Sequence, residues 1–112
     1  MSGLLFTSRS WGNFGLSVGE DEDAVFMRRE ALRNSLSLKS IVFMKQSHSD
    51  VVVFVNGSED IVEADAIVTT EKGAGLAVLV GDCVPILIRG ETCVAAIHAG
   101  RIGMVKIGRA HV

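Results

Sequence analysis

The sequence predicts an α/β fold in which layered, mixed β-sheets are flanked by helices. Acidic residues at 21–23 open a segment whose apolar residues recur at helical spacing. After Lys39 the character changes, and short β-branched runs follow one another with Gly-, Asn- and Ser-containing turns between them. At 112 residues the chain has the length of one domain, so residues 1–112 are predicted to form a single unit.

One amphipathic helix is predicted near the start of the chain. Its apolar positions recur at helical spacing and are Ala24, Val25, Ala31, Leu32 and Leu36. The acidic residues at 21–23 suit the positive end of the helix dipole. We expect Arg28, Arg29 and Arg33 to form the solvated face of this helix, and not a binding patch.

Strands are predicted wherever short apolar, β-branched runs stand between turn residues. The runs are 4–7, 41–44, 51–55, 66–69, 76–80, 85–88 and 93–97, and an ordered loop is expected over 8–19. Several runs are apolar throughout, which indicates strands covered on both faces. The short turn at 89–92 predicts that the two runs beside it pair as an antiparallel hairpin. One clear helix cannot cover such sheets on both sides, so the chain is expected to pair with something or to belong to a longer protein.

Charge and hydropathy exclude several classes of protein. The 11 basic and 13 acidic residues give a net charge of −2, which offers no attraction for nucleic acid or an anionic membrane. The longest uncharged stretch, 10–19, is shorter than the ~18 apolar residues of a membrane span. The first residues contain no basic segment or long apolar run, so no secretory signal is expected. With two cysteines expected as reduced thiols, these features predict a cytoplasmic protein.

Two histidines and one cysteine interrupt apolar runs at predicted strand ends. They are His48, Cys83 and His98. Imidazole nitrogen and thiolate sulfur suit Zn²⁺, and three protein ligands leave a fourth tetrahedral position open, as in catalytic zinc sites. Their spacing matches none of the compact zinc motifs. Of the remaining residues of these types, Cys93 is expected in the core and His111 in solvent.

Other chemistry is open to the same residues. Cys83 could act as a nucleophile with either histidine as its base and with Asp82 or Asp65 as the orienting carboxylate, as in a Cys–His hydrolase. Residues 100–103 place Arg101 between glycines before an expected helix start, where backbone N–H groups and the guanidinium would bind an anion such as phosphate. The residue pattern alone does not choose between zinc and covalent chemistry.

Four strings of residues carry these candidates and stand in a specific order. They are Gln46-Ser47-His48-Ser49, Ala64-Asp65-Ala66-Ile67-Val68-Thr69, Gly81-Asp82-Cys83-Val84-Pro85 and His98-Ala99-Gly100-Arg101. Together they resemble the laccase-domain proteins, also called the YfiH-type or multicopper polyphenol oxidase-like family. The family's patterns are roughly Q-V-H-G, A-D-A-(L/I)-V-T, (A/G)-D-C-x-P and H-A-G-(W)-R-G. The resemblance extends over about residues 4–108.

The resemblance implies a fold of layered mixed sheets and a metal site formed by His48, Cys83 and His98. Zn²⁺ is the ion implied, with Cu²⁺ as the alternative behind the older laccase label. The activity implied is that of a purine nucleoside phosphorylase, which converts adenosine, inosine or methylthioadenosine and phosphate to the base and ribose 1-phosphate, with adenosine deaminase activity as well. Arg101 is then expected to help bind phosphate. The partners implied are these small molecules, with self-association into a homo-oligomer left open.

The sequence departs from the family patterns at three points. Arg101 stands one position earlier than the family's arginine, and Ser49 replaces the glycine that follows the first histidine. Family members are roughly twice as long, so we expect the chain to be the N-terminal half of such a domain, in truncated form. Asp65 is expected to be structural, and Asp82 to orient a ligand. The alternative functions are a truncated, non-catalytic metal-binding module that pairs through its uncovered sheet, a copper-dependent polyphenol oxidase and a Cys–His hydrolase.

Overall fold

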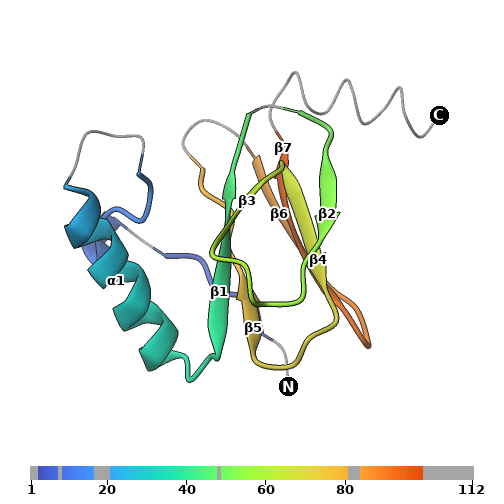
Figure 1. The fold of residues 1–112 in the computed structure, drawn as a ribbon, viewed down its shortest axis with the longest axis horizontal. Coiled ribbons are helices and arrows are strands. Elements are labelled where there is room, and N and C mark those ends of the chain that lie inside the picture. The colour runs from blue at the N-terminus through green and yellow to red at the C-terminus, as the bar shows by residue number, and fades with distance from the viewer. Residues whose placement is uncertain (1–2, 8, 17–20, 48, 81–83, 100–112) are drawn as a thin grey trace.

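A computed structural model describes residues 3–7, 9–16, 21–47, 49–80 and 84–99 (Figure 1). A 3-10 helix, η1, spans Arg9–Trp11, and the α-helix α1 spans Glu22–Ser35. The strands are β1 Ser40–Lys45, β2 Val52–Phe54, β3 Ile61–Glu63, β4 Ala66–Thr69, β5 Ala74–Leu76, β6 Val84–Arg89 and β7 Val94–Ala99.

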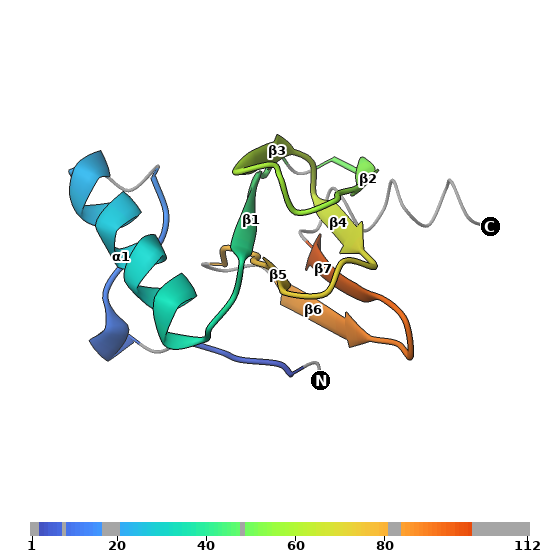
Figure 2. The same cartoon turned by 60° about the horizontal axis from the view of Figure 1, so that its bottom comes forward.

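The strands form two sheets that lie in separate layers. A three-stranded parallel sheet has the order β3-β1-β5, and a four-stranded mixed sheet has the order β2-β4-β7-β6. Figure 2 shows α1 on one side of the three-stranded sheet and the four-stranded sheet on the other. The predicted α/β class with layered mixed sheets is confirmed, with α1 as the one α-helix among the described residues.

The predicted helix is confirmed, and local signals explain its start. Asp21 is the N-cap, and its side chain accepts a hydrogen bond of 3.2 Å from the backbone N–H of Asp23. Val25 lies on the face toward β1 and is fully buried. No helix among the described residues combines the length and the apolar character needed to cross a lipid bilayer.

The prediction of a solvated arginine face is wrong for Arg29, which is only 7% exposed. Arg29 follows Val25 by one helical turn and therefore points the same way, onto the three-stranded sheet. Its guanidinium carbon lies 3.7 Å from the centroid of the Phe43 ring. Its Nε and Nη2 both donate to the carbonyl oxygen of Phe14, at 2.9 and 2.7 Å. Burial lowers the pKa of Arg29, while the charge of Asp60 acts in the opposite direction.

The predicted hairpin is confirmed, because β6 and β7 pair antiparallel from Val84↔Ala99 to Arg89↔Val94. Residues 4–7, predicted as a strand, form none. The strand predicted at 76–80 begins and ends earlier, as β5, and β3 was not predicted. Cys93, predicted in the core, is half-buried and lies just before β7.

The main core lies between the two sheets. Its buried side chains are Val42, Met44, Val55, Ala64, Ile67 and Ala96. In β1, Val42 and Met44 point into this core, while Phe43 points to the opposite side, where it contacts Arg29. The prediction that strands are covered on both faces is correct for β1. It is wrong for β2 and β6, whose burial alternates along the strand.

Candidate metal-binding site

His98 is the predicted site residue that the structure describes. It lies near the end of β7, and it is only 4% exposed. The other predicted site residues, His48, Cys83 and Arg101, lie outside the described residues, and Asp82 and His111 do as well. Among the described residues, no group of three His, Cys, Asp or Glu side chains lies close enough together to hold a metal ion.

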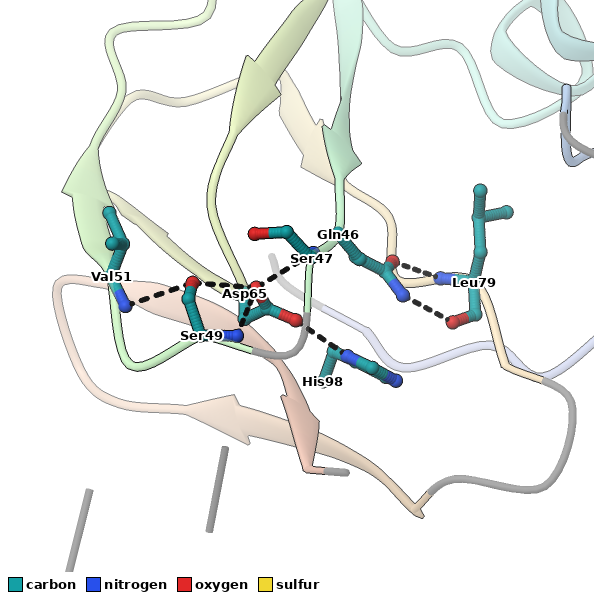
Figure 3. Close-up of polar contacts among 7 residues, drawn as sticks. All are labelled: Gln46, Ser47, Ser49, Val51, Asp65, Leu79 and His98. Atoms are coloured by element: carbon teal, nitrogen blue, oxygen red, sulfur yellow. Dashed lines mark hydrogen bonds and ion pairs between the residues drawn. The ribbon is translucent and has the colours of Figure 1, made fainter. Parts of the chain in front are cut away.

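Asp65 connects His98 to the loop that follows β1. The carboxylate is 1% exposed and lies just before β4, and its Oδ2 accepts a hydrogen bond of 2.7 Å from Nδ1 of His98 (Figure 3). Its Oδ1 accepts from the backbone N–H of Ser47 at 3.0 Å and from that of Ser49 at 2.9 Å. The Ser49 hydroxyl donates to the same oxygen at 2.7 Å. The backbone N–H groups of the residues before and after position 48 are therefore bonded to the carboxylate that bonds His98.

These hydrogen bonds determine the charge of Asp65. Burial raises the pKa of the carboxyl, but the hydrogen bonds from His98, Ser49 and Ser47 outweigh it and hold the pKa well below its usual range. An ionised carboxylate can only accept, so Nδ1 of His98 carries the hydrogen. In the neutral imidazole the lone pair then lies on Nε2, which is the nitrogen suited to coordinate a metal. The arrangement is the carboxylate–histidine pair found beside many metal ligands.

Backbone bonds fix the position of this pair. The N–H of His98 donates to the carbonyl oxygen of Asp65 at 2.7 Å, and the N–H of Asp65 donates to the carbonyl oxygen of Val51 at 3.1 Å. The antiparallel pairing of β4 with β7 begins at the next pair, Ala66↔Ile97. Asp65 and His98 thus lie at one end of a sheet, where side chains on a rigid scaffold often form a site.

Gln46 holds a second segment against β1. Its side-chain Nε2 donates to the carbonyl oxygen of Leu79 at 2.7 Å, and its Oε1 accepts from the N–H of Leu79 at 2.8 Å (Figure 3). This pair of bonds replaces the backbone ladder beyond β5, whose last bond runs from the N–H of Ala77 to the carbonyl oxygen of Val42 at 2.9 Å. Gln46 stands two residues before His48, and Leu79 stands four residues before Cys83.

The roles of Gln46, Ser47 and Ser49 do not follow from the sequence pattern. For Asp65 the sequence allows an orienting carboxylate or a structural residue, and the structure shows its contact with His98. The signal for Gln46 is its place directly after the last residue of β1, Lys45, where a neutral amide can continue backbone pairing. The substitution of Ser for Gly at position 49 adds a hydrogen bond to Asp65.

The fold and this site define a mixed α/β protein with a carboxylate-held histidine at a sheet end. The family model described as multi-copper polyphenol oxidoreductase laccase matches residues 6–111, and the chain belongs to this family. It is similar to a purine nucleoside phosphorylase of Corynebacterium glutamicum, with 40% identity over an alignment of 116 residues. The alignment covers 88% of this chain and 47% of the relative. Another purine nucleoside phosphorylase, from Streptomyces coelicolor, is 41% identical over 83% of this chain and 41% of its own length.

A solved structure supports the same assignment. The crystal structure of a Neisseria meningitidis protein of the family DUF152 matches with a TM-score of 0.70 and 33% identity, over 89% of this chain and 45% of that protein. The chain therefore spans less than half the length of the relatives that it matches.

Proposed function

We propose that this chain carries the metal-binding part of a zinc-dependent purine nucleoside phosphorylase, with His48, Cys83 and His98 as the ligands. The observation that supports this most is the Asp65 carboxylate, which bonds Nδ1 of His98 and the peptide N–H groups on both sides of position 48. A carboxylate that accepts the ring N–H is the usual partner of a metal-binding histidine, and this one also accepts from the residues before and after position 48. The names of the relatives support the activity.

The donor set fits a zinc ion. Two imidazoles and a thiolate are preferred ligands, and they leave a fourth position for substrate. Asp65 fixes the hydrogen of His98 on Nδ1 and so presents Nε2 as the ligand atom. Gln46 ties the segment before Cys83 to the end of β1. When bound, Zn²⁺ supplies a Lewis acid that draws electron density from a substrate oxygen.

The proposed reaction is phosphorolysis of a purine nucleoside such as adenosine, inosine or methylthioadenosine. A phosphate oxygen bonds to C1′ of the ribose as the bond from C1′ to the purine nitrogen breaks, and the base leaves with the electron pair of that bond. Arg101 is proposed to bind the phosphate, because a guanidinium matches two phosphate oxygens at once. Adenosine deamination is proposed as a second activity of the same site.

Copper-dependent oxidation of phenols is the second candidate function. The description of the matching family favours it, and imidazole and thiolate ligands also suit copper. A third outcome is metal binding without catalysis, since this chain spans less than half of each relative. The three functions differ in the ion bound and in the requirement for phosphate.

Metal content and phosphorolysis test the proposal in sequence. After loading with zinc and dialysis, we expect about one zinc ion per chain by mass spectrometry, lost in His98→Gln and retained in the matched control His111→Gln. The zinc-loaded chain is then expected to release hypoxanthine from inosine only when phosphate is present, with a raised KM for phosphate in Arg101→Ala. Zinc bound without any phosphorolysis would favour the non-catalytic module, and copper bound with phenol oxidation would favour the second candidate.

A further inference from the structure

The four-stranded sheet has one face that points away from the core. The inward side chains Val53, Ile67, Leu87 and Ala96 pack in or against the core between the sheets. Successive residues of a strand point to opposite faces, so the neighbours of these residues form the outer face. By the strand register, the outer face consists of Val52, Phe54, Ala66, Val68, Val84, Ile86, Ile88, Ala95, Ile97 and Ala99.

Every side chain on this outer face is apolar, and the strands that carry them are hydrogen-bonded neighbours. The small side chains of Ala66 and Ala99 are buried, whereas the larger side chains on the edge strands β2 and β6 are exposed. Paired residues form rows across all four strands, such as the row Phe54↔Val68, Val68↔Ala95 and Ala95↔Ile88. An antiparallel sheet with one face in water ordinarily carries polar residues on that face. Phe54 is 75% exposed, and the apolar side chains of β6 on this face are also exposed. A contiguous apolar patch of this kind marks a surface that contacts another molecule or domain.

The other described elements lie on the opposite side of this sheet. The layers run from α1 through the three-stranded sheet and the core to the four-stranded sheet, so α1 cannot reach the outer face (Figures 1 and 2). The face carries no charged or hydrogen-bonding side chain, so a partner that fits it must also present an apolar surface.

The relatives indicate what covers the face. The matched part of the Neisseria meningitidis structure has the same fold as this chain, yet it is only 45% of that protein. In the Corynebacterium glutamicum relative the matched part is 47%. More than half of each relative therefore lies outside the part that matches this chain. The outer face is a contiguous apolar surface on the side of the sheet away from the core, and its edge strands are exposed.

We propose that this outer face is the docking surface for the polypeptide that corresponds to the unmatched half of the relatives. That polypeptide would bury Phe54 and the β6 side chains Val84, Ile86 and Ile88 with an apolar surface of its own. The proposal goes beyond the proposed function and does not depend on zinc or on phosphorolysis.

A chimera tests the proposal. The unmatched part of the Corynebacterium glutamicum relative is fused after this chain, so that it is held at high effective concentration. Phe54→Asp is then introduced into the chimera and, separately, into the 112-residue chain. The matched control is Met27→Asp, because Met27 is equally exposed, at 74%, but lies on α1.

We expect Phe54→Asp to lower the melting temperature of the chimera by about 5 °C or more and to change that of the 112-residue chain much less. Met27→Asp should leave both nearly unchanged. Ile88→Asp, on the opposite edge strand, should repeat the effect of Phe54→Asp. Equal effects of Phe54→Asp in both proteins, or none in the chimera, would overturn the proposal. So would a stable homodimer of the chain that Phe54→Asp dissociates, because the face would then bind a second copy.

Discussion

Asp65 and Arg29 are both buried charged residues, and the protein accommodates them in different ways. Asp65 accepts hydrogen bonds from the loop after β1 and from His98 on β7. Arg29 donates to a single carbonyl oxygen, that of Phe14, and stacks on the ring of Phe43. The partners of Asp65 belong to the segments that carry candidate metal ligands, whereas those of Arg29 join α1 and the preceding loop to the three-stranded sheet.

The two residues also differ in how burial affects their charge. For Asp65 the hydrogen bonds outweigh burial and lower the pKa, so the charged form is favoured. For Arg29 burial is the larger influence on the pKa, and it disfavours the charged form. A carboxylate whose charged form is stabilised by its hydrogen-bond partners is typical of a functional site. A guanidinium stacked on an aromatic ring is typical of a packing contact. Variants at Asp65 should therefore affect both zinc binding and stability, whereas variants at Arg29 should affect stability alone.

The largest loss of stability and of zinc affinity is expected for Asp65→Ala. It leaves the buried Nδ1 hydrogen of His98 and the partly buried N–H groups of Ser47 and Ser49 without their acceptor. Each donor left unsatisfied away from water costs about 1–3 kcal/mol, so we expect a loss of about 3–5 kcal/mol of unfolding free energy. Zinc affinity should also fall by about 10–100-fold, because His98 loses its fixed orientation. Urea denaturation and competition with a chelator measure the two effects. A stable variant with unchanged zinc affinity would show that Asp65 does not position His98.

Arg29→Met should be less destabilising and should leave zinc binding intact. The methionine fills much of the space beside Phe43 but leaves the carbonyl oxygen of Phe14 without its donor. We expect a loss of about 1–3 kcal/mol. Zinc affinity should be unchanged, because Arg29 lies on the far side of the three-stranded sheet from His98 and distant sites act independently. The same two measurements apply. A fall in zinc affinity as large as that of Asp65→Ala would remove the distinction between the two buried charges.

Of these two residues, Asp65 alone should lower the free energy of unfolding as the pH falls. Because its folded-state pKa is lower than the unfolded value near ~3.9, the unfolded chain binds more protons between these two values. The stabilisation is therefore complete above about pH 5 and is lost as the pH falls toward the folded-state pKa. The loss should be smaller than in Asp65→Ala, because a protonated carboxyl keeps its shape and part of its acceptor capacity.

Urea denaturation between about pH 3 and 7 measures this dependence. The control is Asp65→Asn, which does not titrate, and the difference between the two curves isolates Asp65 from the other carboxylates. Stability of the unmodified chain should fall more steeply on acidification than that of the variant. Parallel curves would mean that the hydrogen bonds do not hold the carboxyl in its charged form.

The sequence predicts those parts of the fold that local interactions determine. The helix could be predicted because Asp21 and the spacing of its apolar residues lie within one segment. The β6–β7 hairpin could be predicted because a short turn joins its strands. In contrast, β3 is only three residues long and is a strand because Ile61 and its neighbours pair with β1. That pairing depends on contacts distant in sequence, which a local pattern does not contain.

The candidate site was predicted as a set of residue types, without its internal contacts. His98 was identified from its place at a strand end, and the structure places it at the end of β7. Its partner Asp65 is 33 residues away in sequence, so the bond between them depends on the pairing of β4 with β7. The burial of Arg29 does not follow from the local pattern for the same reason, because it depends on contacts with Phe43 and Phe14.

The smallest effect is expected for Ser49→Gly, which restores the glycine of the family pattern at this position. The variant loses the hydroxyl that donates to Asp65 at 2.7 Å, but it keeps the backbone N–H that donates to the same oxygen at 2.9 Å. A hydrogen bond to a charged group contributes about 1.5–3 kcal/mol. Since Ser49 is half-buried, a hydrogen bond from water can replace part of the contribution of the hydroxyl. The added backbone freedom of glycine costs about 0.5–1 kcal/mol. We therefore expect a net loss of about 1–2 kcal/mol.

Ser49→Ala separates the two contributions, because it removes the hydroxyl without adding backbone freedom. If the hydroxyl matters chiefly to Asp65, Ser49→Ala should show most of the loss and a modest rise in the pKa of the Asp65 carboxyl, measured by NMR titration. Zinc affinity should change much less than in Asp65→Ala, since the bond from His98 to Oδ2 remains. A large loss of zinc affinity in Ser49→Ala would instead mean that Ser49 is as important as His98 in orienting the carboxylate, and that the charge of Asp65 alone does not hold the site.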